Sequence, residues 1–237
     1  MELINNNGEE PMMEKKGSTL SIFGREFTVT DDDYVDEEAE MRKNNLQNNF
    51  NNQVPKMFLK ASFENYRTET DSEKEALKES KLLVQRIKDG DCNEVLMFYG
   101  NFGTGKTHLG CSMLREVFGT YVSSFNLCVE YQSCTDFKSK QNKLQMLKKY
   151  TTEPLLIIDE IGRGNSNIEF EILPQIVNQR FENMLPTVLI TNLDKMMLND
   201  RLGKATVDRL NECCVSVNFT GKSKRLSLRQ YPVKNSK

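Results

Sequence analysis

The chain has 237 residues, of which 38% are hydrophobic and 28% charged, which is typical of one large globular domain or of one domain with an appendage. No run approaches the ~18 apolar residues of a membrane-spanning helix, and the N-terminus lacks the apolar core of a secretory signal. We therefore expect a cytoplasmic protein with no membrane partner. Six cysteines without C-x-x-C spacing and a single histidine argue against a zinc site.

The charge is unevenly distributed along the chain. The formal net charge is −2, but residues 1–52 hold 5 Lys/Arg against 12 Asp/Glu, and residues 201–237 hold 9 against 2. An acidic front and a basic end are compatible with two different partners. The alternative is a solvated N-terminal segment ahead of a near-neutral domain.

Residues 1–54 differ in composition from the rest. An apolar patch at 21–29 alternates weakly and is compatible with a strand or the edge of a hairpin. An acidic run at 31–40 and an Asn-rich stretch at 43–53 follow. Since such a composition buries little apolar surface, we expect a linker here, ahead of a domain at 55–237.

From about residue 56 the hydrophobic pattern becomes periodic. Helices are expected at 71–90, where Ser72 and Glu75 have capping-box spacing, and at about 107–118, 138–149, 168–183 and 205–211. Strands are expected at 95–99, 121–127, 155–158, 187–190 and 215–219. Because several strands are apolar on both faces and alternate with helices, the chain predicts an α/β fold with a parallel sheet flanked by helices.

A glycine-rich segment, 100–107, carries the strongest functional signal. It fits G-x-x-x-x-G-K-[ST] between an expected strand and an expected helix. Such a loop cradles phosphates with backbone N–H groups at a helix N-terminus. Lys106 would neutralise phosphate charge, and the Thr107 hydroxyl would hold Mg²⁺. The candidate nucleotide-binding residues are Gly100, Asn101, Phe102, Gly103, Thr104, Gly105, Lys106, Thr107 and His108; for His108, packing or polar support of the helical turn is favoured over catalysis.

Acidic and amide side chains follow two later strands. Asp159 and Glu160 end the strand at 155–158, at the sheet edge where ligands bind in open α/β folds. Asp159 would complete the Mg²⁺ shell, and Glu160 would polarise the attacking water. Asn192 ends the next strand and could orient that water. The pattern favours ATP hydrolysis over nucleotide storage, although a strand ending in a polar turn is the simpler alternative for each position.

Two basic features are less specific. Arg209, in Asp-Arg-Leu, could stabilise the transition state on a neighbouring subunit, or be a surface arginine. A lysine-rich stretch between Phe137 and Tyr150, two possible stacking groups, could track the phosphates of single-stranded DNA, or be a solvated helix face. Its members are Lys138, Lys140, Lys143, Lys148 and Lys149.

In this order the motifs resemble the AAA+ ATPases, and more narrowly the DnaC/IstB-type helicase-loader ATPases, from about residue 55 to 225. Segments that carry the resemblance include 63–66, 105–109, 158–162, 175–180, 191–192, 202–203, 208–210, 217–219 and 223–225. Only 28 residues follow Arg209, too few for the usual AAA+ helical lid, which fits the loader subfamily.

The resemblance implies a role for each matching residue. Lys106 and Thr107 take the Walker A roles, and Asp159 and Glu160 take the Walker B roles, with ATP and Mg²⁺ as cofactors. Asn192 corresponds to the sensor 1 residue, Arg209 to the arginine finger acting on a neighbour's ATP, and Arg225 to a late arginine near the γ-phosphate.

The resemblance also implies partners. The family assembles into an open spiral that binds single-stranded DNA, and the N-terminal segment grips a replicative helicase of the DnaB type. In this chain the apolar patch of Ile22, Phe23, Phe27 and Val29 is the candidate contact, with a disordered acidic tail as the alternative. Two other functions remain open: an IstB-like transposition helper, and an adaptor that does not hydrolyse its nucleotide.

Overall fold

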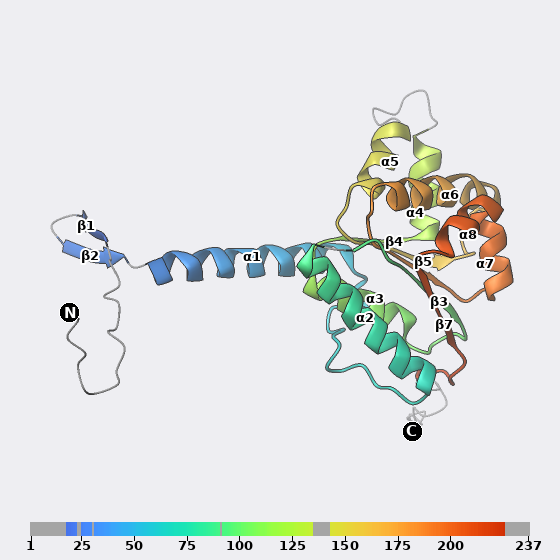
Figure 1. Ribbon diagram of the computed structural model, residues 1–237, viewed down its shortest axis with the longest axis horizontal. Helices are drawn as coiled ribbons and strands as arrows, with labels where there is room; N and C mark the ends of the chain where they lie inside the picture. The colour runs from blue at the N-terminus through green and yellow to red at the C-terminus, as the bar shows by residue number, and fades with distance from the viewer. Residues whose placement is uncertain (1–17, 23–24, 30, 91, 135–142, 226–237) are drawn as a thin grey trace, which may run out of the picture. The chain divides into compact units, whose positions relative to one another are not determined.

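The computed structural model describes residues 18–22, 25–29, 31–90, 92–134 and 143–225 (Figure 1). The chain divides into two compact units, residues 1–45 and 46–237. None of the helices in the described ranges is long and apolar enough to cross a membrane.

The N-terminal unit contains a two-stranded antiparallel sheet. Strand β1 (Ser18–Ile22) pairs with β2 (Arg25–Val29), with Leu20 opposite Phe27. The apolar patch therefore lies on a pair of strands, as one of the two sequence-based alternatives proposed, although Phe23 lies outside the described residues.

Helix α1 (Asp31–Gln53) corrects the expectation of a linker at 43–53. Its last turn is fixed by packing within the second unit, where Phe50 is only 1% exposed and the Arg115 guanidinium lies 4.5 Å from the centre of its ring. The Gln53 side chain also accepts a hydrogen bond from the Tyr121 backbone N–H at 3.1 Å. Packing of the Phe50 ring thus stabilises the end of a helix that the polar composition of this segment did not predict.

The second unit is built on a five-stranded parallel sheet with the order β4-β5-β6-β3-β7. The strands are β3 (Val95–Gly100), β4 (Thr120–Ser123), β5 (Leu156–Ile161), β6 (Thr187–Thr191) and β7 (Cys214–Phe219). Between β5 and β6 the register shifts from Ile158 to Ile161, so that Asp159 and Glu160 lie at the irregularity. The two acidic residues thus occupy a break in the ladder, beside the end of β6.

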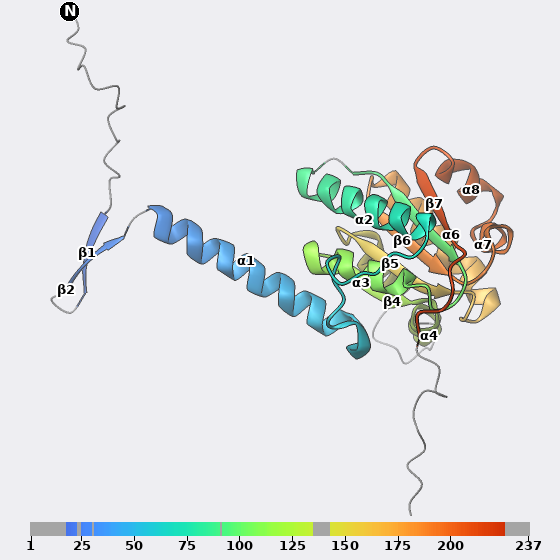
Figure 2. The same cartoon turned by 90° about the horizontal axis from the view of Figure 1, so that it is seen from below.

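Helices cover both faces of this sheet (Figures 1 and 2). Side chains of α2 (Asp71–Asp89) and α3 (Lys106–Glu116) belong to one core, and those of α4 (Ser124–Ser133), α5 (Lys143–Thr151), α6 (Ser166–Glu182), α7 (Lys195–Leu202) and α8 (Lys204–Leu210) belong to the other. Alternate residues of β3 enter the two cores: Leu96 and Phe98 the first, Val95 and Met97 the second. In the described part of the chain, no helix follows β7, and no helical lid domain is present.

At three helix N-termini the structure differs from the sequence-based expectation, and in each case the difference concerns the N-cap residue. The expected strand 121–127 ends at Ser123, whose hydroxyl accepts a hydrogen bond from the Asn126 N–H at 3.2 Å and begins α4. Helix α2 is capped by Thr70, not Ser72, and its capping box is completed by Glu73. Helix α7 was not expected, and it begins at an Asp194 cap.

Candidate functional site

The glycine-rich segment forms a tight loop between β3 and α3. Gly100 and Gly105 have φ angles of +110° and +101°, which disfavour other residues. A Cβ on Gly100 would lie 2.6 Å from the Phe219 carbonyl oxygen, and one on Gly105 would lie 2.7 Å from the Tyr66 ring. The loop is therefore closely packed against its neighbours, and its shape requires glycine at both positions.

Lys106 is held inside this loop. It is only 5% exposed, and its Nζ donates to the carbonyl oxygens of Gly100 at 2.9 Å and Asn101 at 2.6 Å. Its pKa is lowered to about 8: burial has the largest effect, the nearby Asp159 carboxylate partly opposes it, and Arg225 adds to it. An anion at this loop would favour the charged ammonium.

Asp159 is buried, with an exposed fraction of 2%. Its carboxylate accepts hydrogen bonds from the Tyr121 hydroxyl at 2.9 Å and the Glu160 N–H at 2.6 Å. Burial raises its pKa, while hydrogen bonds from Thr107 and Tyr121 lower it. The Thr107 hydroxyl and the Asp159 carboxylate therefore meet at one point, and such hard oxygen donors suit Mg²⁺. Tyr121 was not identified from the sequence, because nothing in the pattern of its strand indicates that its hydroxyl contacts Asp159.

Glu160 adopts a left-handed backbone conformation, with φ +56°, which is uncommon outside glycine. Its carboxylate accepts a 2.6 Å hydrogen bond from Nη1 of Arg163, three residues later. Local strain of this kind concentrates at functional sites. Arg163 is a second residue that sequence reasoning missed, since a lone arginine in a turn carries no pattern.

A cavity of about 320 Å³ brings these groups together. It is lined by the P-loop residues 102–107 and His108, by Asp159, Glu160 and Asn192, and by Arg163 and Arg225. Met57, Phe58, Tyr66 and Phe102 add an apolar part to the lining. The structure thus places Lys106, Thr107, Glu160, Asn192 and Arg225 around one space, with polar and apolar walls that suit a nucleotide.

The segment after β7 holds Arg225 at this cavity. The Asn101 amide donates to the carbonyl oxygens of Thr220 at 3.1 Å and Gly221 at 3.2 Å, and the Lys224 N–H donates to the Gly103 carbonyl oxygen at 2.8 Å. Residues 220–225 therefore run along the P-loop and are hydrogen bonded to it. His108 also has a supporting contact, since its Nε2 lies 3.0 Å from the Ser62 carbonyl oxygen.

Arg209 lies apart from the cavity. It is on α8, half-exposed, and its Nη1 lies 3.1 Å from a carboxylate oxygen of Glu182. Within one chain, therefore, Arg209 does not line the same space as Lys106 and Glu160.

The lysine-rich stretch is only partly described, because Lys138 and Lys140 lie outside the described residues. The Lys149 ammonium pairs with Glu130 at 3.0 Å, and Lys143 lies 3.8 Å from Glu171, while Lys148 is exposed. Tyr150 is buried and donates to Glu130, which corrects its expected role as a stacking group. The charge available for DNA on the described part of this stretch is smaller than the lysine count indicates.

Comparisons with known proteins agree with this geometry. Residues 26–231 match a family model described as IstB-like ATP binding protein. The replicative helicase loader DnaC of Escherichia coli (strain K12) is 30% identical over 203 residues, 82% of each chain. A crystal structure of the DnaC helicase loader superposes with a TM-score of 0.59 at 22% identity, covering 70% of this chain and all of that one. AMPPCP-bound DnaA from Aquifex aeolicus gives 0.52 at 20% identity, covering 67% of this chain and 50% of that one. The expected AAA+ fold is confirmed.

Proposed function

The chain belongs to the IstB-like ATP binding protein family, and on that basis we propose that it hydrolyses ATP to load a replicative helicase of the DnaB type onto single-stranded DNA. One observation supports hydrolysis above all: Lys106, Asp159, Glu160 and Asn192, from three separate segments, line a single cavity. A pure nucleotide-binding scaffold would have no use for an acid placed to polarise water.

In the proposed reaction the P-loop amides and Lys106 bind the phosphates. Thr107 and Asp159 would hold Mg²⁺, which supplies charge neutralisation on the phosphate oxygens. Glu160 accepts a proton from the attacking water, and the Asn192 amide orients that water. Each of these residues lines the cavity, so that the roles are geometrically compatible.

Arg209 completes the proposed site from a neighbouring copy of the chain. Its position on α8, outside the cavity of its own chain, supports a role in trans. An arginine supplied in this way stabilises the charge of the transition state. The isolated chain is then a slow ATPase, and an open spiral of copies around DNA is a fast one.

The helicase-loading role rests on similarity to DnaC, which extends over 82% of both chains. We propose that the N-terminal unit, with its β1–β2 pair, contacts the helicase. The description of the family model as IstB-like supports a second candidate, a transposition helper that binds duplex DNA and a transposase.

A pull-down from host lysate, with ATP and with ADP, separates these functions. The full chain is compared with a truncation that starts at residue 46, because Phe50 belongs to the core of the second unit. ATP binding by the truncation is the control for its folding. We expect a replicative helicase with the full chain and none with the truncation.

Capture of a transposase would move the function to transposition and leave the ATP site intact. Capture of neither partner in either nucleotide state would contradict both candidates.

A further inference from the structure

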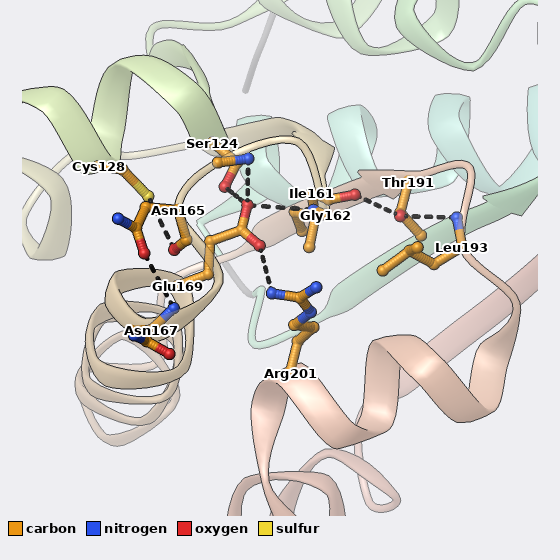
Figure 3. Close-up of polar contacts among 11 residues, drawn as sticks. Ser124, Cys128, Ile161, Gly162, Asn165, Asn167, Glu169, Thr191, Leu193 and Arg201 are labelled. Carbon is orange, nitrogen blue, oxygen red and sulfur yellow. Dashed lines mark hydrogen bonds and ion pairs between the residues drawn. The ribbon is translucent and has the colours of Figure 1, made fainter.

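A buried carboxylate is hydrogen bonded to the turn that follows Glu160. Glu169, labelled in Figure 3, lies in the first turn of α6. Its side chain is fully buried, with an exposed fraction of 0%. Its Oε1 accepts hydrogen bonds from the Gly162 N–H at 3.1 Å, the Gly164 N–H at 2.9 Å and the Ser124 hydroxyl. Its Oε2 accepts from Nη1 of Arg201 at 3.0 Å. One side chain thus connects the turn, α4 and α7.

The turn that is hydrogen bonded to Glu169 contains Arg163, the ion-pair partner of Glu160. Gly162 and Gly164 flank Arg163, whose guanidinium pairs with Glu160 at 2.6 Å. Both glycine N–H groups donate to the same carboxylate oxygen, so the backbone on either side of Arg163 is fixed. A Cβ on Gly164 would lie 2.8 Å from that oxygen, which shows how closely the backbone approaches it.

The other side of the turn is tied to β6. The Thr191 hydroxyl donates to the Ile161 carbonyl oxygen at 2.7 Å and accepts from the Leu193 N–H at 3.0 Å (Figure 3). Thr191 directly precedes Asn192. Residues 161–164 therefore lie between two sets of hydrogen bonds, one from Glu169 and one from the residue beside Asn192.

We propose that Glu169, through residues 161–164, is a positioning residue that sets where the Glu160 carboxylate lies relative to Asn192 and the nucleotide. The inference rests on the proposed ATPase function and deepens it. Glu160 has a φ of +56°, a conformation that persists only where its surroundings impose it. The charge-assisted hydrogen bonds of a buried carboxylate are among the stronger restraints a fold can apply.

Arg201 extends this restraint to α7. Its side chain is 15% exposed and its guanidinium lies 4.9 Å from the centre of the Phe170 ring. Helix α7 follows the turn that contains Asn192. The Glu169–Arg201 pair therefore ties the turn after Glu160 to the helix that follows Asn192, two residues that line the same cavity.

Glu169→Gln tests the proposal with little change in shape. An amide offers one acceptor oxygen where the carboxylate offers two, so its NH₂ group must face either Arg201 or the donors at Oε1. The matched control is Glu171→Gln, the same change two residues along α6, where the carboxylate contacts Tyr131 and Lys143 outside the cavity. Ser124→Ala, which removes one of the donors, serves as a milder second variant.

The readouts are single-turnover hydrolysis of Mg-ATP with protein in excess, the ATP Kd, and amide hydrogen exchange of peptides covering 160–164. We expect hydrolysis by Glu169→Gln to slow by about 10- to 100-fold, because small displacements of a catalytic group have effects of this size. The ATP Kd should change by less than about twofold, exchange at 160–164 should accelerate, and Ser124→Ala should show a smaller loss of the same kind. Glu171→Gln should match the wild type in all three.

Equal loss in Glu171→Gln, or a loss of ATP affinity as large as the loss of rate, would overturn the proposal, because Glu169 would then serve stability alone. Unchanged exchange at 160–164 in Glu169→Gln would overturn it even if the rate fell. A wild-type chain that binds ATP without turning it over would instead contradict the proposed function, while exchange would still report whether Glu169 holds the turn.

Discussion

Nζ of Lys224 lies 3.1 Å from the carboxylate of Glu73, which is 1% exposed in its side chain, at the first turn of α2. The same ammonium lies 4.6 Å from the centre of the Tyr66 ring. The contact joins the segment after β7 to the helix that precedes the P-loop strand, and Arg225 is the next residue. Lys224 lines the nucleotide cavity beside Arg225, and its ion pair with the buried Glu73 therefore fixes the place of both residues.

Lys224→Met should weaken both folding and nucleotide binding. Removal of the cation leaves Glu73 as a buried carboxylate without its ion partner, and such losses cost about 3–5 kcal/mol of the free energy of unfolding. We expect the free energy of unfolding, measured with urea, to fall by about 3 kcal/mol, and the ATP Kd to rise several-fold. The control, Lys222→Met, changes an exposed lysine of the same segment and should leave both values unchanged. Equal effects in the two variants would exclude a specific role for the pair.

The burial of Lys106 predicts a pH dependence of ATP binding. Its pKa is lowered to about 8, so the fraction of charged ammonium falls as the pH rises through 8. If only the charged form binds phosphate, the ATP Kd rises by about tenfold per pH unit above this value. Lys106→Arg keeps its charge throughout and should show a flat profile, even if its affinity is lower. Equally steep profiles in both proteins would assign the dependence to another group.

Phe50→Ala should destabilise the second unit although Phe50 lies on α1. The side chain is 1% exposed within the core that contains α2 and α3, and truncation of a buried phenylalanine costs about 3–5 kcal/mol. Met41→Ala, on the same helix but 67% exposed, is the control and should cost less than about 0.5 kcal/mol. Thermal unfolding of the two variants, monitored with a bound ATP analogue, measures the loss of stability in each. A Phe50→Ala value near that of the control would mean that the last turn of α1 is not part of the core.

Mixing two inactive variants tests whether Arg209 acts on a neighbour. Lys106→Ala lacks the phosphate-binding ammonium but keeps Arg209, and Arg209→Ala keeps the nucleotide site but lacks the arginine. With single-stranded DNA present, a mixture should recover part of the ATP hydrolysis that neither variant shows alone. No recovery should occur when a chain that carries both substitutions is mixed with either single variant. Absence of recovery in the first mixture would place Arg209 outside the reaction.

Much of the fold follows from hydrophobic periodicity, because three of the five parallel strands, β3, β5 and β6, carry runs of apolar residues that are recognisable from the sequence of each strand alone. The P-loop and the pair Asp159–Glu160 were equally visible, since their chemistry depends on residues adjacent in sequence. The contacts of Glu73 with Lys224 and of Ser124 with Glu169 join residues 151 and 45 positions apart, and only the folded sheet brings them together. The last turn of α1 was missed for a similar reason, because Phe50 gains its meaning from a core formed by distant segments.

Glu160→Gln provides the most direct test of the central claim that the cavity is a site of ATP hydrolysis. The change removes the proton acceptor and keeps the shape, and general-base catalysis contributes about 10²–10⁴-fold. Single-turnover hydrolysis of Mg-ATP in the presence of single-stranded DNA should therefore fall by at least about 100-fold, while the ATP Kd stays within about twofold of the wild type. A variant that hydrolyses ATP at the wild-type rate would contradict the claim.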